Sequence, residues 1–277
     1  MFDAGGAVKK WTLGTALALL LLFVATATYA QGGISSFNCA GALSRTIIQG
    51  LNNHGQLVGQ CNSASFLYSN GVVTYLEGSY ANGINNLGQI VGWNGNQGYL
   101  YDNGTYTVIQ YPGAWLTVAF GINDNGVIVG SYQVSEYSEQ QHGFVYNNGT
   151  YTSVDYPGAA TTQLYGINSA GEMVGAFCNP GCRSSHGFLA DGSNYTQIDF
   201  PGAQGTALFG INNNGVLVGG YNNEIAFIYE KGTFESVDYR GSADTAFWGV
   251  NDNGEFVGYW LDAHQNFHGL KGDLQNP

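Results

Sequence analysis

Gly121-Ile122-Asn123-Asp124-Asn125-Gly126-Val127-Ile128-Val129-Gly130 is one of six copies of a decamer that recurs along the chain. The other copies begin at Gly50, Gly83, Gly166, Gly210 and Gly249, so that the intervals are 33, 38, 45, 44 and 39 residues. A self-similar period of roughly 20 to 50 residues is typical of repeat architectures such as solenoids and propellers. The decamer therefore predicts the fold class before any single residue is considered.

Each repeat is predicted to form four short strands, most clearly in the third repeat at 116–123, 127–132, 142–146 and 151–156. Asn148-Gly149 joins the last two strands, and both residues tolerate the positive φ of a type I′ hairpin turn. Pro157 cannot donate to a β-ladder, so it ends the fourth strand and begins the crossing to the next repeat. Four antiparallel strands in about 40 residues indicate a propeller blade.

The two ends of the chain indicate a closed ring. The sixth repeat offers strands at 246–251, 255–260 and 267–270 and then ends. Residues 36–42 align with 153–159, the fourth strand of the third repeat and the turn after it. We therefore predict an all-β, six-bladed β-propeller of four-stranded antiparallel blades. Its closing strand is expected at 34–42, its blades at 43–270 and a short tail at 271–277.

The first thirty residues predict an export signal. Lys9 and Lys10 precede an uncharged apolar run over 11–24, and small residues follow at 25–30. Fourteen apolar residues fall short of the roughly 20 that span a bilayer, so cleavage after Ala30, or alternatively Ala27, is expected. A retained N-terminal anchor is the alternative. We expect a single domain over 31–277, secreted or periplasmic, monomeric and without membrane contact after cleavage.

Composition excludes one class of partner. The chain has 43 glycines at periodic positions, only 9% charged residues and a net charge of −12. Removal of residues 1–30 leaves 18 acidic and 5 basic side chains, a charge of −13. Nucleic-acid affinity comes largely from Lys and Arg that displace counterions, so no nucleic acid is expected. No glycine stretch has phosphate-loop spacing before a helix, and we expect no cofactor.

The cysteines Cys39, Cys61, Cys178 and Cys182 predict two disulfides, because the count is even and the chain carries an export signal. Cys178 and Cys182 flank a turn that could be bridged locally, which leaves Cys39–Cys61 as the second pair. The second bridge would tie the closing strand to the first blade. A zinc site is the alternative, although two separate pairs of cysteines fit it poorly.

The repeat resembles the bacterial extracellular repeats of the HAF family. The resemblance rests on the Gly-Ile-Asn-x-x-Gly-x-x-Val-Gly decamer, the His142-Gly143-Phe144 and His186-Gly187-Phe188 steps and the Asp-Tyr-Pro-Gly-Ala run at Asp155. It covers nearly the whole chain after residue 30. The family is defined by its repeat and its export signal, and the resemblance implies no activity.

Three histidines occupy the same repeat position. Hairpin register places His142 opposite Asp155, His186 opposite Asp199 and His268 opposite Asn38. A His–carboxylate pair can orient a general base or a metal ligand. Equivalent residues in different blades lie too far apart to share one metal, so we interpret each pair as a cross-strand hydrogen bond. We expect no metal site and assign no catalytic residue.

Two further series are interpreted as structural. The Asn-Asp-Asn-Gly turns carry one acid at most, whereas a calcium loop needs several oxygen ligands from carboxylates, so we predict plain turns. Gly121 and its equivalents are expected to let blades approach near the axis. Phe120, Tyr165, Phe209 and Trp248 precede these glycines and are expected to pack between blades; a ligand-stacking ring is the alternative.

Function is expected on the face that carries the long loops. The connections of the second to the third strand and between blades vary in length, with long inserts at 131–141, 176–185 and 259–266. Variable loops on a rigid scaffold commonly bind ligands. The candidate binding residues on this face are Trp93, Trp115, Tyr132, Tyr137, Arg183, Tyr221, Asp244, Trp260, Asp262 and His264.

The expected function is an exported binding or interaction module for a polysaccharide or a partner protein. The alternative is a propeller enzyme that cleaves extracellular carbohydrate with loop acids, for which Glu136, Glu139, Asp244 and Asp262 are candidates. A purely structural role in the cell envelope is a third possibility, and ordinary loop cover explains the same residues without any ligand.

Overall fold

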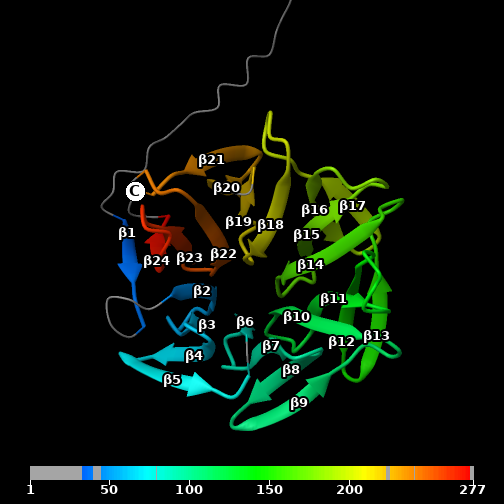
Figure 1. Ribbon diagram of the computed structural model, residues 1–277, viewed down its shortest axis with the longest axis horizontal. Coiled ribbons are helices and arrows are strands. Elements are labelled where there is room, and N and C mark those ends of the chain that lie inside the picture. The colour runs from blue at the N-terminus through cyan, green and yellow to red at the C-terminus, as the bar shows by residue number, and fades with distance from the viewer. Residues whose placement is uncertain (1–32, 40–44, 79, 223–224, 240, 275–277) are drawn as a thin grey trace, which may run out of the picture.

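A computed structural model describes residues 33–39, 45–78, 80–222, 225–239 and 241–274. The described residues form six four-stranded antiparallel sheets arranged in a ring (Figure 1). The predicted six-bladed β-propeller is confirmed. The expected signal peptide at 1–30 lies outside the described residues, and among those described no helix is long and apolar enough to cross a membrane.

Each of the first five blades uses consecutive strands, with the innermost named first. The first blade contains β2 (Thr46–Leu51), β3 (Leu57–Cys61), β4 (Ala64–Ser69) and β5 (Val72–Leu76), and the second contains β6 (Tyr80–Ile84), β7 (Ile90–Asn94), β8 (Gln97–Asp102) and β9 (Thr105–Ile109). The third contains β10 (Leu116–Ile122), β11 (Ile128–Gln133), β12 (His142–Asn147) and β13 (Thr150–Val154), and the fourth contains β14 (Thr161–Ile167), β15 (Met173–Cys178), β16 (Ser185–Asp191) and β17 (Asn194–Gln197). The fifth contains β18 (Thr206–Ile211), β19 (Leu217–Tyr221), β20 (Ile225–Glu230) and β21 (Thr233–Val237).

The sixth blade joins both ends of the chain. It contains β22 (Thr245–Val250), β23 (Glu255–Leu261) and β24 (Phe267–Asp273), and β1 (Ile34–Phe37) adds the outermost strand. In Figure 1 the blue β1 lies beside the red β24, and Ile34 pairs with Gly272 while Phe37 pairs with Gly269. The predicted closure is confirmed. β24 continues to Asp273, so the expected tail begins three residues later than 271.

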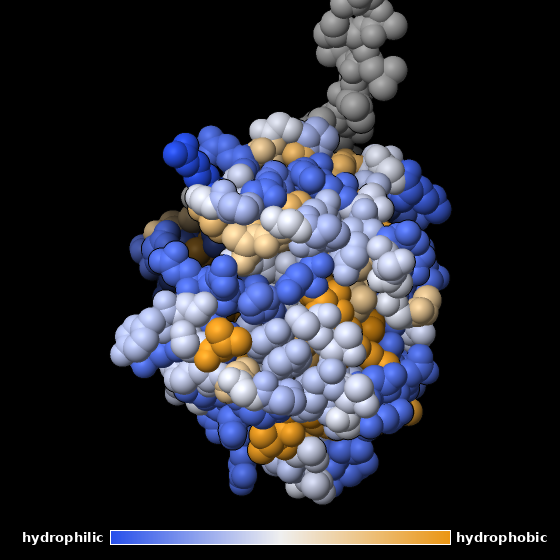
Figure 2. Space-filling model, turned by 90° about the vertical axis from the view of Figure 1, so that its right-hand side faces the viewer, coloured by the Kyte–Doolittle hydropathy of each residue, from blue (hydrophilic) through white to orange (hydrophobic). Residues whose placement is uncertain are grey.

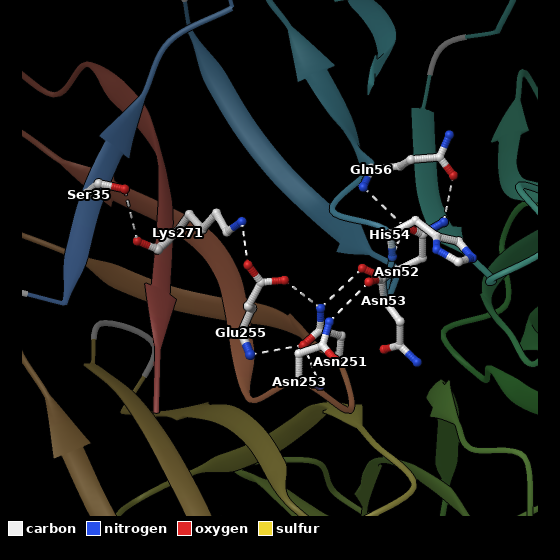
Figure 3. Close-up of polar contacts among 9 residues, drawn as sticks. All are labelled: Ser35, Asn52, Asn53, His54, Gln56, Asn251, Asn253, Glu255 and Lys271. Atoms are coloured by element: carbon white, nitrogen blue, oxygen red, sulfur yellow. Dashed lines mark hydrogen bonds and ion pairs between the residues drawn. The ribbon is translucent and has the colours of Figure 1, made fainter. Parts of the chain in front are cut away.

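A ring of buried asparagines holds the inner ends of the blades together. The Asn at the third position of each decamer donates from Nδ2 to the backbone carbonyl of the equivalent Asn in the next blade, at 2.9 to 3.3 Å. The ring closes when Asn251 donates to the carbonyl of Asn52, as Figure 3 shows. The six residues, all 3–5% exposed, are Asn52, Asn85, Asn123, Asn168, Asn212 and Asn251.

The same asparagines organise their own turns. Asn123 Oδ1 accepts the backbone N–H groups of Asn125 at 3.1 Å and Val127 at 3.0 Å, and the other five copies repeat this arrangement. A side chain that satisfies local donors in this way stabilises a turn. The Asn therefore acts twice, in its own turn and in the joint to the next blade.

The hydrophobic core lies between adjacent blades. One cluster combines Val91 and Ile109 of the second blade with Ile122, Ile128 and Phe144 of the third. The Phe that follows each His-Gly step, or its equivalent, is fully buried in four blades. Burial of such a side chain contributes roughly 1.5–3 kcal/mol. Gly121 allows this close packing, because a Cβ there would lie 2.8 Å from the carbonyl oxygen of Tyr165 in the next blade.

Aromatic pairs link consecutive blades nearer the rim. Tyr111 stacks on Tyr132 with ring centroids 3.7 Å apart and planes within 3°. Tyr156 with Phe177, and Phe200 with Tyr221, repeat this arrangement at 3.6 and 3.8 Å. At the joint of the sixth and first blades the same two positions hold Cys39 and Cys61, which form a disulfide. The closing joint is thus covalent where these three joints are stacked.

Both predicted disulfides are present, Cys39–Cys61 across 22 residues and Cys178–Cys182 across 4. They fit an oxidising environment outside the cytoplasm. Figure 2 shows the side of the ring that lies on the right of Figure 1, and this surface is largely hydrophilic with small, separate apolar patches. The apolar side chains of the core are therefore turned away from this face.

Candidate functional site

A β-bulge in every blade aims one side chain at the ring axis. The register between the two inner strands shifts once per blade, for example between Ala119 and Gly121, so that Phe120 has no partner residue opposite it. A bulge of this kind redirects a side chain, and bulges are over-represented beside functional sites. The six residues at this position are Gln49, Asn82, Phe120, Tyr165, Phe209 and Trp248.

Four of these residues form a continuous aromatic arc, which is defined as Phe120, Tyr165, Phe209 and Trp248. Phe120 meets Tyr165 edge to face at 4.9 Å, and Tyr165 meets Phe209 in the same way at 5.1 Å. Phe209 and Trp248 lie 4.3 Å apart with planes at 33°. These rings contact one another between blades as predicted, but each stays partly exposed. They consequently line a cavity and are not a sealed core.

Gln49 and Asn82 complete the circle on the other side. Asn82 is buried and donates from Nδ2 to the carbonyl oxygen of Ala119 at 2.8 Å. Together with the aromatic arc, these two amides surround an opening on the axis with a volume of about 80 Å³, which we call the axial mouth. No charged side chain is among the described residues that line it. Of the six bulge residues around the mouth, four are therefore aromatic and two are amides.

Two polar atoms of the axial mouth lack hydrogen-bond partners within the described part of the chain. They are Gln49 Oε1 and Trp248 Nε1, and both are buried. A buried polar group without a partner costs about 1–3 kcal/mol. By contrast, the Tyr165 hydroxyl donates to Gln163 Oε1 at 2.6 Å, and burial raises the pKa of Tyr165, so that phenol stays neutral.

The opposite end of the axis is built from a second tier of polar side chains, one residue beyond the asparagine ring. Asn86 donates to Asp124 from N and Nδ2 at 2.8 and 2.7 Å. Asn213 donates to Asp252 in the same way, from N and Nδ2 at 2.8 Å each, and Asn53 donates to it from Nδ2 at 2.8 Å. Partial burial opposes ionisation of Asp252, but these hydrogen bonds outweigh it and lower its pKa.

The side-chain oxygens of this second tier accept hydrogen bonds from the turn of a neighbouring blade. Among the described residues no group of three His, Cys, Asp or Glu could hold a metal ion. The hydrogen bonds of Asn123 Oδ1 show that these segments form turns, as predicted.

A second cavity of about 140 Å³ lies between the fifth and sixth blades. It shares Phe209 and Trp248 with the axial mouth and adds Asp244 and Tyr259. The Tyr259 hydroxyl donates to Asp244 Oδ2 at 2.9 Å, and burial followed by the Asp244 charge raises the pKa of Tyr259. Asp244 is thus the one residue among the sequence-predicted candidates that lies beside the aromatic arc.

The other candidate aromatics of the long-loop face are engaged in packing. Tyr132 and Tyr221 belong to the stacks between blades, and Trp93 stacks on Tyr80 at 4.5 Å. Trp260 stacks on His268 at 4.5 Å and meets Tyr239 edge to face at 5.3 Å. Because neighbouring rings occupy their faces, we leave these four residues outside the candidate site.

The remaining candidates are dispersed. Tyr137 is 91% exposed and Trp115 is 38% exposed, and Arg183 and His264 are exposed too. Asp262 caps its own loop, since its carboxylate accepts hydrogen bonds from Asn266, His264 N and His268 Nε2. These bonds, with the Asn266 side chain first, lower the pKa of Asp262 far below its usual range.

The loop acids proposed for an enzyme do not gather. Glu136 and Glu139 are exposed, and the low pKa of Asp262 makes it unsuitable as a general acid. Asp244 is the single carboxylate among the described residues that line the cavity between the fifth and sixth blades. Glycoside cleavage commonly needs a pair of carboxyl groups, and the described residues that line this cavity supply only one carboxyl group.

Each of the three predicted histidine pairs forms a cross-strand contact. His142 Nδ1 lies 2.9 Å from Asp155, His186 Nδ1 lies 2.8 Å from Asp199, and His268 Nδ1 lies 3.2 Å from Asn38 Oδ1. The predicted partners are confirmed. The pairs belong to the third, fourth and sixth blades and do not converge on one centre.

Gln49 and Asn82 were missed as site residues in the sequence. The signal that could have found them is their position, because each stands directly before the first Gly of a decamer, where the other four copies carry an aromatic residue.

Comparison with solved structures supports the fold. AofleA from Arthrobotrys oligospora, in an arginine-to-alanine triple mutant, is similar with a TM-score of 0.56 and 9% identity over 89% of this chain and 90% of that one. The β-propeller domain of the Trilobed protease from Pyrococcus furiosus is similar with a TM-score of 0.51 and 12% identity over 84% and 79% of the two chains. A Dyadobacter fermentans protein of unknown function is similar at 0.52 and 11% over 87% and 97%.

No family model matches the chain, and no curated protein does so either. At identities of 9–12%, the similarity supports a shared fold and gives no evidence of a shared function. The chain is a six-bladed β-propeller whose axial mouth and adjoining cavity form its candidate binding site.

Proposed function

We propose that this protein is an exported binding module whose axial mouth binds a sugar residue of an extracellular polysaccharide. The observation that carries the proposal is the arrangement of the aromatic arc opposite Gln49 and Asn82 around one opening. Sugars present apolar C–H faces to aromatic rings and hydroxyl groups to amides, and pockets of mixed apolar and polar lining bind small ligands. A partner protein in place of a polysaccharide is an outcome that the following test separates.

Calorimetric titration of the protein, recovered after export of the full chain, tests the proposal against soluble dextran, laminarin, galactomannan and xylan. Release of reducing ends is followed in the same samples. Binding to at least one polymer without release supports a binding module. Release of sugar contradicts it and favours the enzyme, and saturable binding to proteins alone contradicts the carbohydrate ligand.

Phe120→Ala locates the binding site. Loss of one aromatic contact is expected to weaken the affinity about tenfold, which corresponds to about 1.4 kcal/mol. Tyr137→Ala is the matched control, because Tyr137 is an exposed aromatic residue in the connection between β11 and β12, away from the axis. An unchanged affinity of Phe120→Ala contradicts binding at the axial mouth.

A further inference from the structure

The joint between the first and sixth blades differs from the four joints of the axial mouth between the second and the sixth blade. From Phe120 to Trp248 the bulge residues contact one another through their rings, and Asn82 is tied to the carbonyl of Ala119. Gln49 and Trp248 belong to the two blades that meet where the ring closes, and a Cβ on Gly249 would lie 3.4 Å from the Gln49 carbonyl oxygen. Their polar atoms, an acceptor and a donor, are the two at the mouth that lack partners within the described residues.

A hydroxyl group is the ligand group that satisfies both atoms. A hydroxyl donates one hydrogen bond and accepts others, so it can donate to Gln49 Oε1 and accept from Trp248 Nε1–H. One hydroxyl, or two on neighbouring carbons of one sugar, meets this requirement. A carboxylate cannot donate and an ammonium group cannot accept, and no charged side chain among the described lining residues would balance either charge.

The shape of the mouth restricts the part of a polysaccharide that can enter it. Residues of all six blades surround the opening, so that no side is left open for the middle of a chain to pass through. Its volume of about 80 Å³ is well below the roughly 300–1,000 Å³ of common ligand pockets. Such an opening admits all or part of one sugar residue at the end of a chain, and not a longer segment.

We propose that the axial mouth recognises the terminal residue of a neutral polysaccharide, through Gln49 as hydrogen-bond acceptor and Trp248 as donor. This inference rests on the proposed function and names its ligand class. Both atoms are buried, but the Gln49 and Trp248 side chains are partly exposed, so the proposal requires each side chain to rotate and turn its polar atom toward the mouth. The aromatic arc then packs against the apolar face of the same sugar residue.

End recognition is tested by titrating the full-chain protein with a bound polymer from the screen and with fragments of that polymer at equal mass. For end recognition, the half-saturating concentrations agree when they are expressed as moles of chain ends. If they agree when expressed as mass of polymer, the inference is overturned while the proposed function stands. If no polysaccharide binds at all, both are overturned.

Two substitutions test the hydrogen bonds. Gln49→Met keeps the length of the side chain and Trp248→Phe keeps an aromatic ring, and each is expected to weaken binding about three- to tenfold. The melting temperature of Gln49→Met is expected to stay at or above that of the original protein, because an acceptor without a partner is removed. Gln140→Met, at an exposed position outside the mouth, is the matched control. Unchanged affinity in both mouth variants overturns the inference.

Discussion

Asn251 donates its side-chain amide to the backbone carbonyl of Asn52 at 3.1 Å, across 199 residues of sequence. The same amide group also donates to Glu255 Oε2 at 2.8 Å, and Glu255 is bonded in turn to Lys271 at 2.6 Å (Figure 3). The two ends of the chain are therefore joined near the axis by polar contacts as well as at the rim by β1.

Asn251→Ala is expected to destabilise the protein by about 3 kcal/mol. The substitution leaves the backbone N–H groups of Asn253 and Glu255 without their partner, and each such group costs about 1–3 kcal/mol when buried. It also removes one of the two hydrogen bonds that the Asn52 carbonyl accepts, the other coming from Gly55 N–H. Urea unfolding gives the change in free energy. Asn253→Ala is the control, because it removes an exposed hydrogen bond across the same joint, from Asn253 Nδ2 to the Asn53 carbonyl, and not a buried one. Equal effects of the two substitutions would contradict a special role for the ring.

Loss of the Cys39–Cys61 bridge is expected to cost more than loss of Cys178–Cys182. The chain-entropy relation gives about 3 kcal/mol for a separation of 22 residues and about 2 kcal/mol for a separation of 4. Paired Cys→Ser variants, compared by chemical unfolding, measure both values. The reverse order would show that the first bridge does not hold the closing joint.

Gly121→Ala is expected to destabilise the protein by about 1–3 kcal/mol, because the added Cβ would lie 2.8 Å from the carbonyl oxygen of Tyr165. Gly220→Ala is the matched control, since its Cβ would meet neighbouring atoms at 3.6 Å, an ordinary contact distance. Thermal unfolding of the two variants measures the difference. Equal melting temperatures would show that neighbouring blades can separate at the axis without penalty.

Acid is expected to weaken the closing joint through Glu255. Partial burial opposes its ionisation, yet hydrogen bonds from Lys271 and Asn251 outweigh this and lower its pKa below the ordinary value of 4.5. A depressed folded-state pKa contributes stability that is present above 4.5 and lost as pH falls through the folded value. Urea midpoints from about pH 6 to about pH 3 should fall less steeply for Glu255→Gln than for the original protein. Parallel slopes would exclude this contribution.

The sequence predicts the blade and its closure well because both depend on local signals. Asn148-Gly149 fixes its hairpin, and counting back from that turn places His142 opposite Asp155, as observed. The bulge at Phe120, in contrast, is not determined by a local sequence signal. It depends on how β10 and β11 pair, and a shift of one residue between two strands leaves no mark in either strand alone.

The site residues on the long-loop face were harder to predict for a related reason. Tyr132 and Tyr221 stand at the ends of strands, where the sequence does not distinguish a side chain in solvent from one that packs on the next blade. Their stacking partners, Tyr111 and Phe200, come from the preceding blade. Contacts between repeats decide such positions, and the periodicity within one repeat carries no information about them.

Because β1 closes the ring, the sixth blade can form only late in the synthesis and folding of the chain. Ile34 pairs with Gly272, so β1, which is synthesised before the other strands of the ring, has no partner until β24, the last strand of the ring, is synthesised. The sixth blade cannot be completed while residues 267–273 are still unmade. Until then the hydrophobic surface that the final blade covers stays open to any other chain nearby. This surface is buried in the folded protein, but it is exposed in every newly synthesised chain until the sixth blade is complete.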